Sequence, residues 1–154
     1  MPVPRPQLSL KGRALRLQAQ REHSLQELRR KLAAHETEPG EIERVLDELQ
    51  KRGWVNESRV AESLAYRRGP RLGTAKLIRE MQAKGLSQDT IASAVEPLRA
   101  NEFSRAQAVW QRKFGTPATS AQERARQIRF LASRGFSAEV IRQAVAGAGD
   151  DLPD

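Results

Sequence analysis

Arginine and lysine side chains are the residues of this chain whose types and spacing could do chemistry. The sequence has 27 Lys and Arg residues against 19 Asp and Glu residues, which gives a formal net charge of +8. A guanidinium group binds phosphate or carboxylate oxygens through paired hydrogen bonds, so a strongly basic chain favours a polyanionic partner. Arg30, Arg79 and Arg129 also occupy equivalent positions in three similar segments. The candidate binding residues are Arg30, Arg67, Arg68, Arg71, Lys76, Arg79, Arg126 and Arg129.

The recurrence of these arginines suits a partner that is itself periodic, such as a nucleic-acid backbone or a protein filament. Phosphate contacts would give affinity without sequence preference and a steep dependence on salt. The alternative is that each arginine only solvates the outer face of its helix. Aromatic residues are 5% of the chain, and we expect most of them to pack in cores rather than to stack on bases. The tryptophan and phenylalanine residues among them are Trp54, Phe103, Trp110, Phe114, Phe130 and Phe136.

No arrangement of residues in the sequence predicts catalysis. The two histidines, His23 and His35, have no serine or carboxylate partner at a repeated spacing, and we expect both to be exposed. Acid pairs such as Glu41 and Glu43 fit a solvated helix face better than the convergent carboxylates of a metal-dependent nuclease. Because the chain also lacks cysteine and a glycine-rich phosphate loop, the sequence predicts no metal site, no cofactor and no enzymatic activity.

Residues 77–95 and 127–145 are two versions of one segment, fifty residues apart. Seven of their nineteen positions are identical and carry Ile, Arg, Gly, Ser, Ile, Ala and Val in that order. A weaker third copy begins at Leu28 and keeps Ile42 and Leu46 in register, but it lacks the glycine. Such a period predicts an array of helical repeats. We place the repeats at residues 9–53, 54–98 and 99–147, with a disordered N-terminus over 1–8 and an acidic tail over 148–154.

Each repeat is expected to hold three short helices, because every periodic apolar pattern in the chain has the spacing of a helix. Ser24 with Glu27 fits a capping box, and Ser87 and Ser137 fit helix N-caps. The predicted fold is therefore all-α, with three tandem three-helix repeats in an elongated, curved array. The expected helices span residues 9–22, 24–35, 39–52, 56–68, 73–84, 87–97, 101–114, 119–134 and 137–147.

Glycine and proline mark several of the predicted helix ends. Gly53, Gly85 and Gly135 each follow a basic residue and can take the left-handed conformation that ends a helix. A bulky apolar residue follows each glycine, and we expect it to close the turn against the core. Trp54 is the first of these residues. Pro97 is expected to lie at the end of its helix, where proline is tolerated.

The composition predicts a soluble, cytoplasmic protein that does not enter a membrane. Hydrophobic residues make up 38% of the chain, and no apolar run is long enough to cross a bilayer. The first six residues contain no apolar segment of the kind found in a secretory signal. Nothing in the sequence resembles a dimerisation helix, so we expect a monomer.

Three motifs, in this order and at this spacing, resemble those of the RecX family of regulatory proteins. They are residues 46–64 (LDELQKRGWVNESRVAESL), 67–73 (RRGPRLG) followed by 77–91, and 130–141 (FLASRGFSAEVI). The resemblance covers about residues 8–147. One departure is Asn56, where the family usually has an aspartate, and asparagine caps a helix equally well.

The resemblance implies a modulator of the bacterial recombinase RecA. Members of the family consist of three tandem three-helix repeats, bind the RecA filament and single- or double-stranded DNA, and inhibit strand exchange and ATPase activity. It thus implies a non-enzymatic regulator of homologous recombination, DNA repair and the SOS response, and it supplies no catalytic residues. Two alternatives remain open. They are a helix-turn-helix DNA-binding regulator of transcription, which would read one sequence in the major groove, and a nuclease.

Overall fold

All regular structure in residues 7–147, the part of the chain that the computed structural model describes, is helical. This range contains nine α-helices, two 3-10 turns and no strand, which confirms the predicted all-α fold. Residues 1–6 and 148–154, where we expected most of a disordered N-terminus and an acidic tail, lie outside the described residues. The helices are α1 (Leu10–Gln20), α2 (Leu25–Leu32), α3 (Glu41–Lys51), α4 (Glu57–Arg68), α5 (Thr74–Ala83), α6 (Gln88–Ala100), α7 (Glu102–Lys113), α8 (Ala121–Ser133) and α9 (Ala138–Gly147), and the 3-10 turns are η1 (Ala33–His35) and η2 (Gly69–Arg71).

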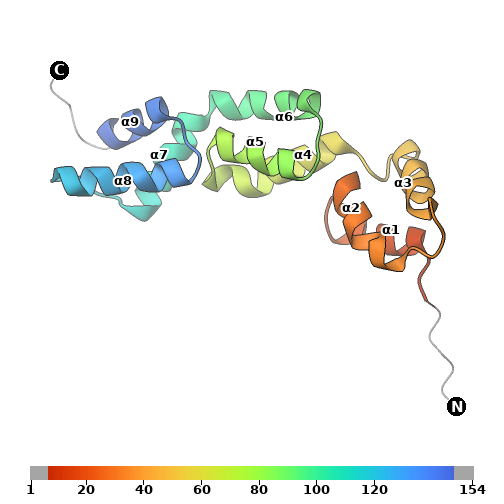
Figure 1. The fold of residues 1–154 in the computed structure, drawn as a ribbon. Coiled ribbons are helices and arrows are strands. Elements are labelled where there is room, and N and C mark those ends of the chain that lie inside the picture. The colour runs from red at the N-terminus through yellow and green to blue at the C-terminus, as the bar shows by residue number, and fades with distance from the viewer. Residues whose placement is uncertain (1–6, 148–154) are drawn as a thin grey trace, which may run out of the picture.

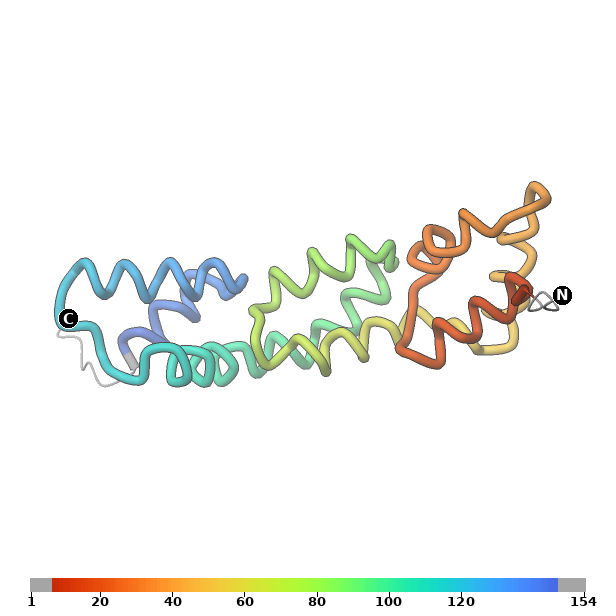
Figure 2. Tube along the Cα trace, turned by 90° about the horizontal axis from the view of Figure 1, so that it is seen from below, coloured from red at the N-terminus to blue at the C-terminus, as the bar shows by residue number. Residues whose placement is uncertain are grey.

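The helices form three units of three that follow one another in an elongated row (Figures 1 and 2). The first unit consists of α1 to α3, the second of α4 to α6 and the third of α7 to α9. Helices α5 and α8 run along the row one after the other (Figure 2). No helix within the described range is long and apolar enough to span a membrane.

Each unit buries its own hydrophobic cluster. The three clusters draw their buried residues from positions 10–55, 60–98 and 106–145. We propose that each cluster is the core of one of the three predicted repeats. Val55, two residues beyond the predicted end of the first repeat, packs in the first cluster. Because each core is small, contacts between neighbouring units add to the stability of the row.

The predicted helix caps and glycine turns are present. The hydroxyl oxygen of Ser24 accepts a hydrogen bond from the amide of Glu27, whose side chain binds the Ser24 amide in return, so the capping box is complete. Gly53, Gly85 and Gly135 have φ angles of 77°, 79° and 87°, the left-handed conformation expected after a helix. These local signals therefore set the boundaries of most helices to within two or three residues.

Pro97 does not mark the end of its helix, which corrects the expectation from sequence. Helix α6 continues through Pro97 to Ala100. Proline removes one hydrogen bond, to the carbonyl of Ser93, but Ser93 is exposed and water can bind that oxygen. Leu98 packs in the second cluster, and its burial holds the last turn of the helix in place.

Two aromatic residues that we expected in the core are instead exposed. Trp54 is 53% exposed, and Val55, which is 2% exposed, takes the buried place after the glycine. Phe103 is 37% exposed. The amides of both Trp54 and Val55 bind the carbonyl oxygen of Leu49, so this turn is shaped to bury the second residue after Gly53.

Candidate functional site

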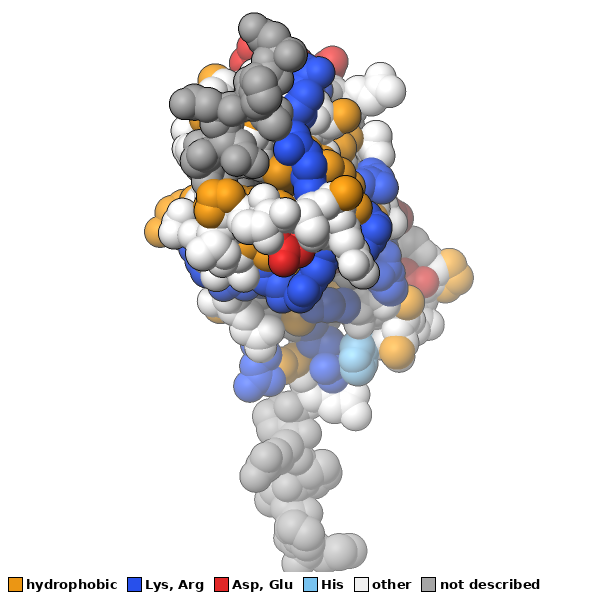
Figure 3. Space-filling view, turned by 90° about the vertical axis from the view of Figure 1, so that its left-hand side faces the viewer, with side chains coloured by type: hydrophobic (Ala, Val, Ile, Leu, Met, Phe, Trp, Pro, Cys, Tyr) orange, Lys and Arg blue, Asp and Glu red, His pale blue; other side chains and the backbone are white. Residues whose placement is uncertain are grey.

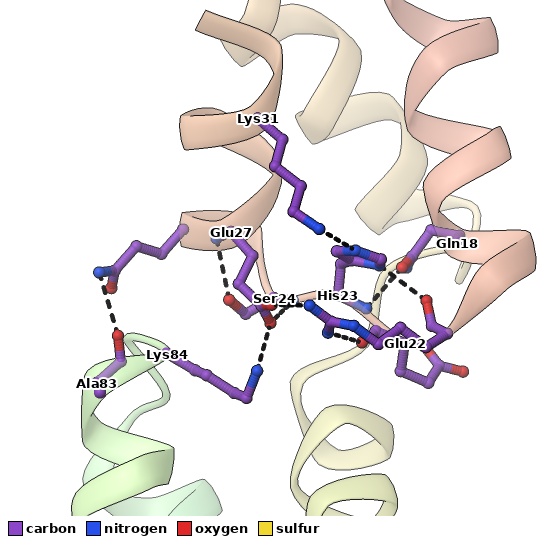
Figure 4. Close-up of polar contacts among 10 residues, drawn as sticks. Gln18, Glu22, His23, Ser24, Glu27, Lys31, Ala83 and Lys84 are labelled. Atoms are coloured by element: carbon purple, nitrogen blue, oxygen red, sulfur yellow. Dashed lines mark hydrogen bonds and ion pairs between the residues drawn. The ribbon is translucent and has the colours of Figure 1, made fainter.

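Glu27 lies where the first unit meets the second (Figure 4). Its carboxylate accepts hydrogen bonds from Arg21 Nη2 at 2.6 Å and from the backbone amide of Ser24 at 3.1 Å. Lys84, which follows α5 in the second unit, places its Nζ 3.1 Å from the same carboxylate. Burial raises the pKa of Glu27, but the hydrogen bonds from Arg21, Ser24 and Lys84 outweigh it and lower the pKa to about 2. Glu27 is therefore a charged link between two units.

His23 lies beside Glu27 and is fully buried, which corrects the expectation that both histidines are exposed. Its Nδ1 is 2.8 Å from the backbone oxygen of Arg21, and its Nε2 is 3.1 Å from Lys31 Nζ (Figure 4). An ammonium group only donates hydrogen bonds, so Nε2 accepts and Nδ1 carries the ring proton. Burial, with the charges of Arg21 and Lys31, lowers the pKa of His23 and favours the neutral ring.

A groove of about 410 Å³ opens beside Glu27 between the first and second units, and we call it the first-junction groove. Three of the predicted binding residues, Arg30, Arg67 and Arg68, line it together. The guanidinium of Arg68 pairs with Glu80 through contacts of 2.8 and 2.7 Å. The groove thus contains acids as well as cations, and the acids neutralise part of its charge.

Arg105 holds the second unit against the third. Its guanidinium lies at the start of α7 and donates to the hydroxyl oxygen of Thr74 at 3.1 Å. It also donates to the backbone oxygens of Gly69, Leu72 and Leu98. Burial lowers the pKa of Arg105, yet guanidinium groups stay protonated in proteins, so the charge is shared among these oxygens.

A pocket of about 380 Å³ lies next to this contact, between η2, α7 and α8, and we call it the second-junction pocket. One wall is Phe130, whose ring centroid lies 5.3 Å from Lys113 Nζ and 4.9 Å from Arg134 Cζ. No acidic residue lines the pocket. Seen from the end of the third unit, Lys and Arg predominate among the charged side chains of the visible face (Figure 3). The basic lining residues are Arg68, Arg71, Arg112, Lys113 and Arg134.

The other predicted binding residues are spread along the row. Lys76 donates to the backbone oxygen of Ser133 at 3.3 Å, so it joins the second and third units. Arg126 lines a separate cavity of about 230 Å³ in the third unit. Arg79 and Arg129 are exposed on α5 and α8 and line neither junction cavity. The eight candidates therefore do not form one patch.

Several important residues were not among the candidates. Arg112, Lys113 and Arg134 supply most of the charge of the second-junction pocket. One signal could have identified Arg134, because it precedes a helix-ending glycine as Lys84 does fifty residues earlier. No sequence pattern indicates that Arg105 joins two units, since most of its partners are backbone oxygens of another unit.

The chemistry available in this structure is that of charge and hydrogen bonding. Within residues 7–147 no group of three or more His, Asp or Glu side chains could hold a metal ion. Every buried side-chain nitrogen or oxygen in that range has a hydrogen-bond partner. Among the described cavities, the two junction cavities gather the most basic side chains.

Known proteins are similar to this chain in both sequence and fold. Models of the first and third three-helix domains of RecX match residues 11–49 and 100–145. Regulatory protein RecX of Leptothrix cholodnii is 52% identical over 92% of this chain and 90% of its own length. Regulatory protein RecX of Ralstonia nicotianae is 45% identical over 100% of this chain and 97% of its own length. The crystal structure of RecX from Lactobacillus salivarius has a TM-score of 0.75 at 14% identity, covering 90% of this chain and 94% of that chain, and so shows the shared fold. The chain belongs to the RecX family of regulatory proteins.

Proposed function

We propose that this chain is a non-enzymatic regulator of homologous recombination and DNA repair that binds the RecA recombinase filament and inhibits its ATPase and strand-exchange activities. Membership of the RecX family, whose relatives are named regulatory proteins, supports the proposal. The protein also binds single- and double-stranded DNA without sequence preference. It acts as a monomer in the cytoplasm and needs no cofactor.

The observation that carries the proposal is the second-junction pocket, with five basic side chains and no acid in its lining. Arg30 and Arg67 in the first-junction groove add positive charge at the preceding joint of the row. Basic side chains at successive joints suit a filament or strand whose acidic groups repeat along its axis. Binding to phosphates releases counterions, so the affinity for DNA falls steeply as salt is raised.

ATP turnover by RecA on single-stranded DNA, titrated with this protein at two salt concentrations, tests the proposal. Turnover falls when the protein is present at a concentration comparable to that of the recombinase or below it. The effect weakens at the higher salt concentration, because salt screens charged contacts. Filament assembly and ATP turnover that are indifferent to the protein would exclude this function.

A further inference from the structure

The two junctions of the row are built from equivalent positions. Helices α4 and α7 have twelve residues each, and both start with a glutamate and end with a basic pair. The turns that follow α5 and α8 correspond to one another at a distance of fifty residues. The first-junction groove and the second-junction pocket are therefore two versions of one cavity. Their corresponding basic residues are Arg67 and Arg112, Arg68 and Lys113, and Lys84 and Arg134.

The acids of the first junction have no counterpart in the second. Glu27, which binds Lys84, directly precedes the buried Leu28 of α2. Lys76 directly precedes Leu77, the equivalent leucine of α5, so a lysine occupies the position of Glu27 in the second unit. Glu80, which pairs with Arg68 in the first junction, is replaced at the equivalent position by Phe130. The acids of the first junction neutralise part of its positive charge, whereas the second junction has the corresponding cations without either acid.

Four cations of the second-junction pocket consequently have no ion-pair partner among the described residues. Arg71, Arg112, Lys113 and Arg134 form no ion pair with any residue in the range 7–147. Like charges around one cavity repel one another and raise the local positive potential. An external anion in the pocket would do for this junction what Glu27 does for the first.

We propose that the second-junction pocket binds the terminal phosphate of a nucleotide, carried either by a free nucleoside triphosphate or by the 5′-phosphorylated end of a nucleic-acid strand. The four cations bind the phosphoryl oxygens, and Arg71 and Arg112 can each do so through paired hydrogen bonds. Phe130, with Leu72 and Val109, forms the apolar part of the lining, against which the base packs.

Charge and size favour this ligand over an internal phosphodiester. Each internal phosphate of a strand carries one charge and lies apart from the next, whereas a polyphosphate or terminal phosphate concentrates charge at one place. A volume of about 380 Å³ is within the range of small-molecule sites, about 300–1,000 Å³. The site lies in the surface that the proposed function assigns to DNA, but nucleotide binding does not depend on the recombinase.

Calorimetric titration of the full chain with inorganic tripolyphosphate, without RecA, tests the site. The wild type shows saturable binding, and Arg112→Ala weakens it roughly tenfold, because a hydrogen bond to a charged group is lost. Arg67→Ala, the change at the equivalent position of the first junction, leaves the affinity within about twofold, because Arg67 lines the first-junction groove and not this pocket. Arg71→Ala, a change in η2 on another wall of the same pocket, should also weaken the binding of tripolyphosphate. A wild type that does not bind tripolyphosphate, or equal losses in Arg112→Ala and Arg67→Ala, would overturn the proposal.

Further titrations distinguish the two sources of the terminal phosphate. ATP binds more tightly than tripolyphosphate if the ligand is a free nucleotide, and Phe130→Leu removes that difference. An oligonucleotide with a 5′-phosphate binds more tightly than the same strand without it if the ligand is a strand end. Absence of both preferences refutes the nucleotide assignment. Binding of tripolyphosphate together with unchanged RecA turnover would refute the proposed function and leave the site intact.

Discussion

Gly73 and Gly135 meet backbone to backbone where the second unit joins the third. The amide of Gly73 donates to the carbonyl oxygen of Arg134 at 2.7 Å. A Cβ atom on Gly73 would lie 2.2 Å from the carbonyl carbon of Gly135, closer than any two such atoms can approach. Gly73 has a φ of −75°, which any residue can adopt, so the glycine is required by the contact and not by its own backbone conformation. The relative position of these two units therefore depends on a missing side chain.

Gly73→Ala should lower the free energy of unfolding by about 1–3 kcal/mol, the usual cost of adding a methyl group where there is no space. Gly69→Ala is the matched control, because its Cβ would meet only a side-chain carbon of Leu98, at 3.6 Å. That change should cost less than Gly73→Ala, because an alanine before Pro70 is disfavoured in the helical conformation but meets no backbone atom of another unit. Urea unfolding followed by circular dichroism measures both values. Equal stability of the two variants would mean that the contact with Gly135 is not tight.

Glu27→Gln should destabilise the protein by about 1–3 kcal/mol, because it weakens hydrogen bonds to two charged partners at a mostly buried position. The exposed pair of Arg29 and Glu43 provides the control, since its side chains are 48% and 60% exposed. Glu43→Gln should cost only about 0–1 kcal/mol. Thermal unfolding of both variants gives the comparison. A loss in Glu27→Gln no larger than that in Glu43→Gln would show that Glu27 does not hold the first junction together.

The stability of the protein should decrease as the pH falls below about 6.5 because of His23. Its pKa is below the ordinary value of 6.5 in the folded protein, so at lower pH the unfolded chain takes up a proton that the folded chain resists. The free energy of unfolding is unaffected by His23 above pH 6.5 and falls as the pH drops below it. Glu27, with a pKa of about 2, stays charged throughout this window.

His23→Asn should flatten this pH dependence, since asparagine can donate to the Arg21 carbonyl and accept from Lys31 without titrating. His35→Asn, which removes an exposed imidazole, is the control for the substitution itself. Denaturant midpoints measured at several pH values check both. If the slopes of the wild type and His23→Asn are identical, the buried ring does not remain neutral in the folded protein.

Binding to double-stranded DNA should be independent of sequence, since the proposed contacts are to phosphates. Fluorescence anisotropy with several duplexes of scrambled sequence should give equal affinities, and the logarithm of the affinity should fall linearly with that of the salt concentration. A strong preference for one duplex would instead favour the alternative of a helix-turn-helix regulator of transcription.

Local signals predicted most of the fold from the sequence. A serine cap such as Ser24 and a glycine such as Gly85 act within one helix end, so they can be recognised without knowing what packs nearby. Pro97 misled because the burial of Leu98 outweighs a single lost hydrogen bond. His23 misled because it lies in a turn, and helical periodicity gives no information about which turn residues are buried.

The candidate site was harder to predict, because it forms between units. Arg71 and Arg134 are more than sixty positions apart in the chain and line one pocket only because the second and third units meet there. Comparison of the repeats indicates part of the site. Replacement of Glu80 by Phe130 at equivalent positions is visible in the sequence, but its effect on charge becomes clear only when the junction is known.

The central claim is that basic residues at the second junction carry the inhibition of RecA. The pocket variant that tests it combines Arg71→Glu with Arg112→Glu. The control variant combines Arg142→Glu with Arg99→Glu and has the same change in net charge. Arg99, like Arg112, lies in the last turn of its helix. All four residues are exposed. The measurement is the protein concentration that halves ATP turnover by RecA on single-stranded DNA. The pocket variant should require about tenfold more protein than the wild type, and the control little more. Equal inhibition by the wild type and the pocket variant would contradict the claim.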